Sequence, residues 1–164
     1  MPHIFHIHRE SLKRRYAVYV VVAKSDNHIE LYVGKVGDNR EGCNPLISRC
    51  GNHFSYNEIH SQIRNKIVGH EARDYTYVFE HFDQYSENPD ERRASIDSIN
   101  EMERWLNQEI QSLAARNTGV TLVNPYKGTG YIRKQERIKR AGFRTKESEI
   151  KIDATVSAVL AVCS

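Results

Sequence analysis

The feature that most constrains this chain is a pair of apolar, β-branched runs that lie close together in the sequence. The first run covers residues 16–23, and the second covers residues 29–33. Turn-forming residues occupy positions 25–27, and this connection is too short to hold a crossover helix. The two runs are therefore predicted to form an antiparallel β-hairpin, with Gly34 ending the second strand.

Two short helices are predicted after the hairpin. Asn44 and Pro45 are typical of a helix start, and Gly51 is expected to end that helix after a short run. Asn57 is a second candidate helix cap. It precedes isoleucines at four-residue spacing, which indicate one buried helix face: Ile59, Ile63 and Ile67.

A third strand and one long helix complete the predicted core. Residues 75–82 are rich in aromatic and β-branched side chains, as expected for a strand. Asn88 and Pro89 repeat the helix-start signal, and the helix that follows is expected to end near residues 117–119. The order of these elements predicts an α/β (α+β) fold, in which a small three-stranded, mainly antiparallel sheet is flanked by helices.

Length and composition fit one compact domain. The chain has 164 residues, of which 39% are hydrophobic, so it can build a core. We expect an N-terminal arm over residues 1–15, the main domain over 16–126, and a basic extension over 127–164 packed on the same domain. The three cysteines form no paired framework, and no apolar run reaches roughly 18 residues, so we expect a cytoplasmic protein without membrane contact.

Positive charge is concentrated near the C-terminus. The whole chain carries a net charge of +3, whereas residues 127–151 hold nine lysines and arginines against three glutamates, a local charge of +6. Such a segment can contact a phosphate backbone, and it can equally be a solvated helix surface. The candidate DNA-binding residues in it are Arg133, Lys134, Arg137, Lys139 and Arg140.

One carboxylate of the long helix falls among apolar residues. At helical spacing the apolar positions from Ile96 to Leu113 share one face, and Glu103 lies on that face, whereas Glu101 points to nearly the opposite side. A buried lone carboxylate costs several kcal/mol unless a cation or hydrogen-bond donors compensate it. Glu103 therefore requires a partner, which a buried salt bridge or a bound metal ion would supply.

The first short helix carries a second group of reactive side chains. Arg49 and His53 are four residues apart, so they share a face with Leu46 if the helix persists past Gly51. A guanidinium binds phosphate in a bidentate manner, and an imidazole moves protons near neutral pH. This pair is therefore a candidate for phosphate binding and proton transfer.

The order and spacing of these residues resemble the GIY-YIG nuclease superfamily. Ala17-Val18-Tyr19 and Tyr32-Val33-Gly34 lie on the two hairpin strands, and Arg49 and Glu103 follow in later helices. The likeness covers roughly residues 16–126. Ala17 and Val18 replace the glycine and isoleucine of the first motif, and Val33 replaces the isoleucine of the second, but both tyrosines are present.

The resemblance implies a divalent-metal-dependent DNA endonuclease of restriction or repair type. Tyr19 and Tyr32 would face the scissile phosphate, and a tyrosine would act as the base. Glu103 would hold one Mg²⁺ or Mn²⁺ ion, Arg49 would stabilise charge on the phosphate, and His53 would assist proton transfer. The site asparagine would be Asn124 or, less well matched because it lacks a neighbouring proline, Asn117. Double-stranded DNA is the expected partner, with a homodimer possible if both strands are cut.

Two other functions compete with this one. A zinc protein is suggested by eight histidines and three cysteines, with Cys43, Cys50 and His53 in one group and His3, His6 and His8 in another. Neither group has the paired spacing of structural zinc sites. The stronger alternative is a nucleic-acid-binding module of the same fold that does not cleave, although such a module has no need of a carboxylate on an apolar helix face.

Overall fold

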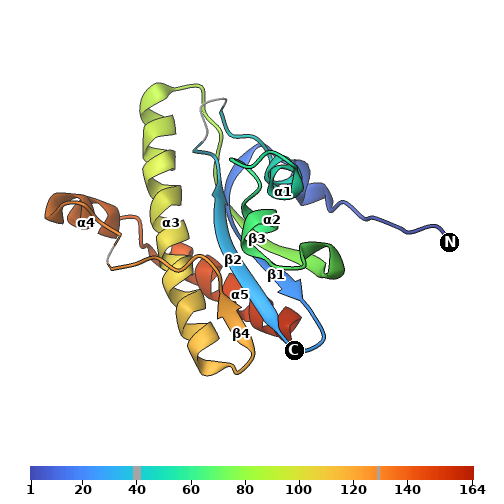
Figure 1. Ribbon diagram of the computed structural model, residues 1–164. Helices are drawn as coiled ribbons and strands as arrows, with labels where there is room; N and C mark the ends of the chain where they lie inside the picture. The colour runs from blue at the N-terminus through green and yellow to red at the C-terminus, as the bar shows by residue number, and fades with distance from the viewer. Residues whose placement is uncertain (39–41, 129) are drawn as a thin grey trace.

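The protein is an α+β fold built on a mixed four-stranded sheet in the order β3-β1-β2-β4. The computed structural model, shown in Figure 1, describes residues 1–38, 42–128 and 130–164. The elements in chain order are η1 Arg9–Leu12, β1 Arg15–Lys24, β2 Ile29–Val36, α1 Leu46–Phe54, α2 Gln62–Lys66, η2 His70–Ala72, β3 Asp74–Gln84, α3 Pro89–Arg116, β4 Val120–Leu122, α4 Lys134–Ala141 and α5 Lys146–Cys163.

The predicted hairpin is confirmed, and its second strand is longer than expected. β1 and β2 pair antiparallel, with Tyr19 opposite Gly34. Gly34 does not end β2, which continues to Val36. The tyrosine ring lies directly over Gly34, so a Cβ there would come within 2.3 Å of a ring carbon of Tyr19. Glycine is needed at this position for a close approach, which is a role that a strand interior permits.

The sheet has four strands, whereas the sequence predicted three. β3 pairs antiparallel with β1, on the edge of the hairpin formed by that strand. On the opposite edge, β4 pairs parallel with β2, with Ile29 opposite Val120. The prediction of three mainly antiparallel strands is therefore wrong in strand number, and the sheet is mixed. The 28-residue helix α3 returns the chain to the β2 edge in the direction of that strand. Three residues of β4 carry too little alternation to signal a strand by themselves.

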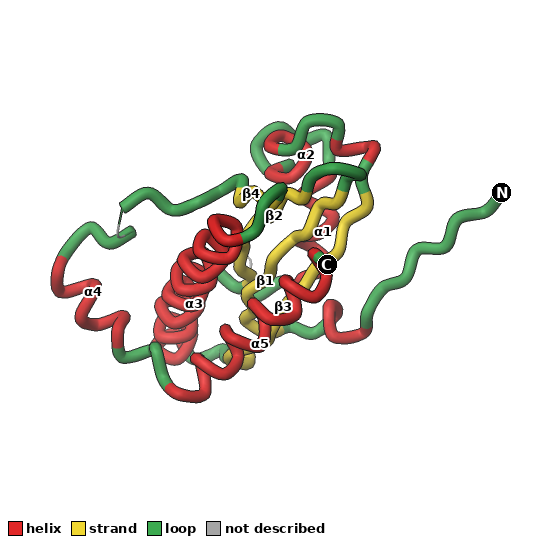
Figure 2. Tube along the Cα trace, turned by 90° about the horizontal axis from the view of Figure 1, so that it is seen from below, coloured by secondary structure: helices red, strands yellow, loops and turns green. Residues whose placement is uncertain are grey.

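Helices cover both faces of the sheet. α3 and α5 lie against one face, while α1 and α2 lie on the other side, as Figure 2 shows. The start of α3 is confirmed, because the Asn88 side chain accepts hydrogen bonds from the backbone N–H groups of Asp90 and Glu91, and Pro89 is the first helical residue. The apolar face of α3 is buried as predicted, through Ile99, Met102, Leu106, Ile110 and Leu113.

The two short helices depart from their predicted bounds. α1 continues through Gly51 to Phe54, and its N-cap is Pro45 without a side-chain hydrogen bond. Packing of α1 against the sheet outweighs the cost of about 1 kcal/mol for an interior glycine. α2 is only five residues long, and Ile59 lies outside it and is exposed. The buried isoleucines of this region are Ile63 and Ile67.

The ends of the chain differ in how they meet the body. The start of the N-terminal arm extends away from it, whereas η1 packs against α1, and α4 projects on the far side of α3 (Figure 1). α5 packs along α3, β3 and β1, and buries Ile152 and Val159. Within the described parts of the chain, no helix combines the length and apolar character needed to cross a membrane.

Candidate functional site

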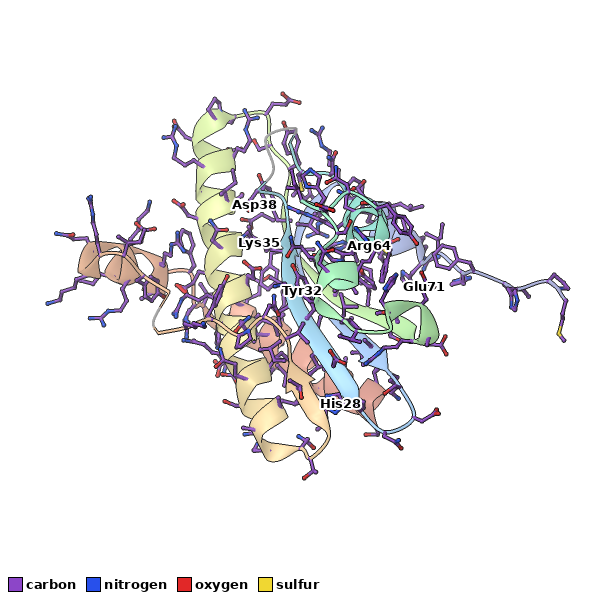
Figure 3. All side chains as sticks on the ribbon, viewed as in Figure 1. His28, Tyr32, Lys35, Asp38, Arg64 and Glu71 are labelled. Atoms are coloured by element: carbon purple, nitrogen blue, oxygen red, sulfur yellow. The ribbon has the colours of Figure 1, made fainter. Side chains whose placement is uncertain are left out.

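An open cavity of about 240 Å³ lies where β1, β2, α1 and α3 meet. Figure 3 shows Tyr32, Lys35 and Asp38 following one another along β2 and into the loop after it, beside α3. Five of the six residues predicted for the active site line this cavity: Tyr19, Tyr32, Arg49, His53 and Glu103. The hairpin strands β1 and β2 thus meet two helices from later in the chain, α1 and α3, at one cavity.

Tyr19 and His53 form the buried floor of the cavity. The Tyr19 hydroxyl lies 3.0 Å from Nε2 of His53, and the two residues are only 2% and 3% exposed. The ring of Tyr32 meets His53 edge-on, with the ring centroids 5.3 Å apart. Because α1 persists past Gly51, His53 stays one turn after Arg49 on the face that meets the sheet. The expectation that Arg49 and His53 share one helix face, which required the helix to continue past Gly51, is therefore confirmed.

Burial controls the protonation of these groups. Removal from water raises the pKa of Tyr19 well above its usual value, and neighbouring Tyr32 adds to this, while Arg49 opposes it. Burial lowers the pKa of His53 to about 4, with a smaller contribution from Arg49. At neutral pH the imidazole is thus uncharged. The Tyr19 phenol keeps its proton unless further positive charge arrives in the cavity.

Arg49 stands at the rim of the cavity in a half-exposed ion pair. Its guanidinium lies 3.1 Å from Oδ1 of Asp38, and the other oxygen of that carboxylate is 3.4 Å from Nζ of Lys35. About a third of each side chain of the Arg49 pair is exposed, at 36% and 30%. Such exposed pairs are weak, typically about 0–1 kcal/mol, so an incoming phosphate can compete for the guanidinium.

Glu103 finds its compensating partner in Lys35. Nζ of Lys35 lies 2.8 Å from Oε2 of Glu103, and the Tyr126 hydroxyl donates to the same oxygen at 2.9 Å. Burial of Lys35 disfavours its charge, but the Glu103 and Asp38 carboxylates outweigh this and raise its pKa. Lys35 was not among the predicted site residues. The sequence does contain a signal for it, because Lys35 is a charged residue on the strand face that otherwise carries apolar residues such as Val33. Glu103 is recognised on α3 by the same kind of interruption.

The open edge of β2 lets Glu103 reach the cavity from the α3 side. Side chains alternate along β2, so Lys35 points to the opposite face from Gly34 and Tyr32. β4 covers β2 only as far as Leu31, so it leaves the edge near Lys35 free of strand pairing within the described residues. Glu103 meets Lys35 at this edge, between the two faces of the sheet.

Asn124 contacts the backbone of β2. Its side-chain oxygen accepts from the Val33 N–H at 3.0 Å, and its amide donates to the Val33 carbonyl at 2.7 Å. Its side chain contacts β2 two residues beyond the last β4–β2 pair, and Asn124 is not among the described residues that line the cavity. Asn117, the other candidate, lies at the end of α3, where its side chain donates to the Leu113 carbonyl. Among the described residues, neither asparagine lines the cavity.

Glu101 is buried, although the sequence placed it opposite the apolar face of α3. It is fully buried, with Nε of Arg104 at 2.9 Å, the Arg144 guanidinium at 3.3 Å and the Tyr131 hydroxyl at 2.7 Å. The expectation that Glu101 faces away from the buried face of α3 holds for the sheet side only. Residues 130–144 cover a second face of α3, and a one-face analysis of the helix could not anticipate that layer.

The predicted DNA-binding residues fall into two groups. Lys139 is paired with Asp97 at 2.8 Å, and Arg140 is paired with Glu136 at 2.7 Å. Each of these two residues thus has an acidic partner within the chain. Arg133, Lys134 and Arg137 lie exposed at the start and on the surface of α4. Of the five predicted residues, these three form no ion pair among the described residues.

The donors at the cavity suit a hard divalent cation better than zinc. Mg²⁺ is commonly held by one or two carboxylates, with water and phosphate oxygens completing its shell, and Glu103 offers such a carboxylate. Across the described residues, no three His, Cys, Asp or Glu side chains gather as a metal-binding group. Burial raises the pKa of the Cys43 thiol to about 11 and also raises that of Cys50, which disfavours the thiolates that zinc requires.

Comparison of the chain with protein-family models, with curated proteins and with solved structures found no match. Its function is therefore inferred from the site itself.

Proposed function

We propose that this protein is a divalent-metal-dependent endonuclease of the GIY-YIG type, hydrolysing DNA phosphodiester bonds with a tyrosine- and histidine-assisted water. The observation that carries the proposal is the convergence of Tyr19, Tyr32, Arg49, His53 and Glu103 on one open cavity. Each residue type in that set has a task in phosphodiester hydrolysis, and the set combines proton transfer with stabilisation of negative charge.

Arg49 and Lys35 would neutralise the phosphate. Both cations are paired with carboxylates, and both line the same cavity as Tyr32. When a phosphodiester enters, its oxygens replace Asp38 as the partner of the Arg49 guanidinium, which suits a bidentate contact. Nζ of Lys35 can leave Glu103 for the phosphate in the same way. Exchange of ion pairs at the rim thus frees both a cation and a carboxylate.

Glu103 would hold the metal ion, with the Tyr126 hydroxyl orienting its carboxylate. A divalent cation bound there supplies charge neutralisation at the phosphoryl oxygens and at the leaving oxygen. Tyr19 would take the proton of the attacking water. Its pKa is raised by burial, so the positive charge that gathers with the substrate is needed before its phenolate becomes populated.

A module that binds DNA without cutting it is the second candidate function. The observation in its favour is the close Lys35–Glu103 pair, which already neutralises the carboxylate. In this protein the cavity would bind a phosphate group, while Lys35 would remain on Glu103.

A plasmid-nicking assay separates the two functions. We expect Mg²⁺-dependent nicking that EDTA abolishes, and a loss of about a hundredfold or more in Tyr19→Phe and in Tyr32→Phe. Tyr16→Phe is the matched control, since Tyr16 lies on the same strand and its buried hydroxyl has no hydrogen-bond partner among the described residues. Binding of plasmid without any nicking would favour the non-cleaving module.

The exposed cations of α4 would help to hold the duplex. Each phosphate contact contributes about 0.9 to the slope of log K against log salt, so replacing Arg133, Lys134 and Arg137 by glutamine should lower that slope by about 2–3. Replacing the internally paired Lys139 and Arg140 should lower it less. Cutting both strands with one cavity per chain requires either a homodimer or two successive events, which sedimentation of the protein–DNA complex distinguishes.

A further inference from the structure

Tyr77 of β3 contacts the side of His53 that faces away from the cavity. Its hydroxyl lies 2.6 Å from Nδ1 of His53, while Nε2 of the same ring lies 3.0 Å from the Tyr19 hydroxyl. The Tyr77 and His53 rings stack with a 21° interplanar angle, and Tyr77 also stacks on Tyr19 at 29°. Tyr77 is absent from the described residues that line the cavity, so it acts there through the residues it contacts, and its hydrogen bond goes to His53.

A neutral imidazole has one donor nitrogen and one acceptor nitrogen, so its two hydrogen bonds cannot be of the same kind. Burial keeps His53 neutral, because its pKa is lowered to about 4. The contact at Nδ1 is shorter than the contact at Nε2, as expected if a hydroxyl donates at Nδ1 and an N–H donates at Nε2. Hydrogen bonds donated by a hydroxyl are shorter, about 2.7 Å, than those donated by N–H, about 2.9–3.0 Å. The short contact at Nδ1 therefore fits the Tyr77 hydroxyl as donor, and the longer contact fits Nε2–H as donor.

We propose that Tyr77 is a positioning residue that donates to Nδ1 of His53 and thereby holds the imidazole as the Nε2–H tautomer, which donates to Tyr19. The catalytic consequence rests on the proposed nuclease function. In this tautomer His53 does not accept the Tyr19 proton. It stabilises the phenolate form of Tyr19 by a hydrogen bond, and it leaves the proton of the neutral phenol directed toward the cavity.

The opposite tautomer would give a different site. With the proton on Nδ1, His53 would donate to Tyr77, and Tyr19 would donate to Nε2. The Tyr19 proton would then be held against His53, and the imidazole would act as a relay. The two arrangements differ in the position of one proton, which nitrogen NMR detects directly.

The test is the ¹⁵N spectrum of the histidine side chains in the full-length protein at neutral pH, with the His53 signals assigned from a His53→Gln sample. We expect a protonated Nε2 and an unprotonated Nδ1 in the wild type. Tyr77→Phe keeps the ring and removes the donor, so it should shift His53 toward Nδ1–H or a mixture. Tyr75→Phe is the control, since Tyr75 lies two residues before Tyr77 on the same face of β3 and its hydroxyl donates to the backbone carbonyl of His70.

A protonated Nδ1 in the wild type would overturn the proposal, as would an unchanged His53 tautomer in Tyr77→Phe. These readouts need no cleavage activity, so they stand or fall separately from the proposed nuclease function. Where nicking is observed, Tyr77→Phe should lower kcat by about 3- to 10-fold, as the loss of one supporting hydrogen bond predicts, with KM unchanged within about twofold. A rise in KM at constant kcat would contradict a role exerted through Tyr19.

Discussion

Glu101 and Glu103 are two residues apart on α3 and have opposite environments. Glu101 is completely buried on the side covered by the C-terminal segment, where Arg104, Arg144 and Tyr131 surround its carboxylate. Glu103 keeps 13% of its side chain exposed at the edge of the cavity, where Lys35 and Tyr126 contact one of its oxygens. Both are carboxylates with a cation and a tyrosine, and they differ in access to solvent and ligand.

This difference separates a carboxylate that stabilises the fold from one that is free to act. Removing one partner of a buried ion pair leaves an uncompensated charge and costs about 3–5 kcal/mol. An accessible pair contributes about 0–1 kcal/mol, so its members can exchange partners. Glu101 ties residues 130–144 to α3. Under the proposed function, a metal ion would take the place of Lys35 on Glu103.

The largest effect is expected from Glu103→Gln, which removes the charge that a hard cation needs. Nicking should fall by about three orders of magnitude or more, equivalent to roughly 4 kcal/mol. The free energy of unfolding should fall by less than in Glu101→Gln, because Lys35 keeps the Asp38 carboxylate as a second partner. Plasmid nicking and urea denaturation measure the two quantities. A strongly destabilised but fully active Glu103→Gln protein would falsify the metal site.

Glu101→Gln should produce the reverse pattern. The substitution leaves Arg104 and Arg144 without their common carboxylate, so we expect the free energy of unfolding to fall by about 3–5 kcal/mol. Activity per folded molecule should stay within a few fold of the wild type. Denaturation curves at one temperature, with nicking corrected for the folded fraction, provide the measurement. An unchanged unfolding midpoint would mean that the Glu101 ion pairs do not stabilise the packing of the C-terminal segment on α3.

Acid should destabilise the folded protein because it favours protonation of His53, which is buried without charge at the cavity. The pKa of His53 is lowered to about 4 in the folded chain, whereas an unfolded histidine titrates near 6.5. Between these values the unfolded state binds more protons, so stability falls as the pH drops from about 6.5 to about 4, by about 3 kcal/mol in total. His53→Gln should lose correspondingly less over that range. Equal losses in both proteins would mean that His53 does not need to remain neutral.

The smallest effects should come from the two tyrosines that contact these carboxylates. Tyr131→Phe removes a donor to buried Glu101 and should cost about 2 kcal/mol of stability, with little effect on nicking. Tyr126→Phe removes a donor to the accessible Glu103 and should cost under about 1 kcal/mol while changing nicking a few fold. Melting curves and nicking rates of the pair test this, and similar behaviour of the two variants would remove the distinction between the carboxylates.

Local sequence patterns were sufficient for the hairpin, for α3 and for much of the candidate site. Alternation and turn residues specify the pairing of residues 16–23 with 29–33, and that pairing places Tyr19 and Tyr32 on the same face of adjacent strands. Helical spacing places Arg49 and His53 on one face of α1, and it identifies Glu103 as a carboxylate that needs a partner. Each of these inferences involves residues within a few turns or strand positions of one another.

The identity of the partners was decided by tertiary structure alone. Lys35 and Glu103 are 68 positions apart, and Arg144 and Glu101 are 43 apart, so no local periodicity links them. The same holds for β4, which gains its place by pairing with β2, and for α1, whose interior glycine is tolerated because the helix packs on the sheet. The sequence by itself determined which side chains required compensation. Only the folded chain decided which groups supply it, because a hydrogen bond or ion pair depends on distances of about 3 Å between atoms that the backbone brings together from different elements.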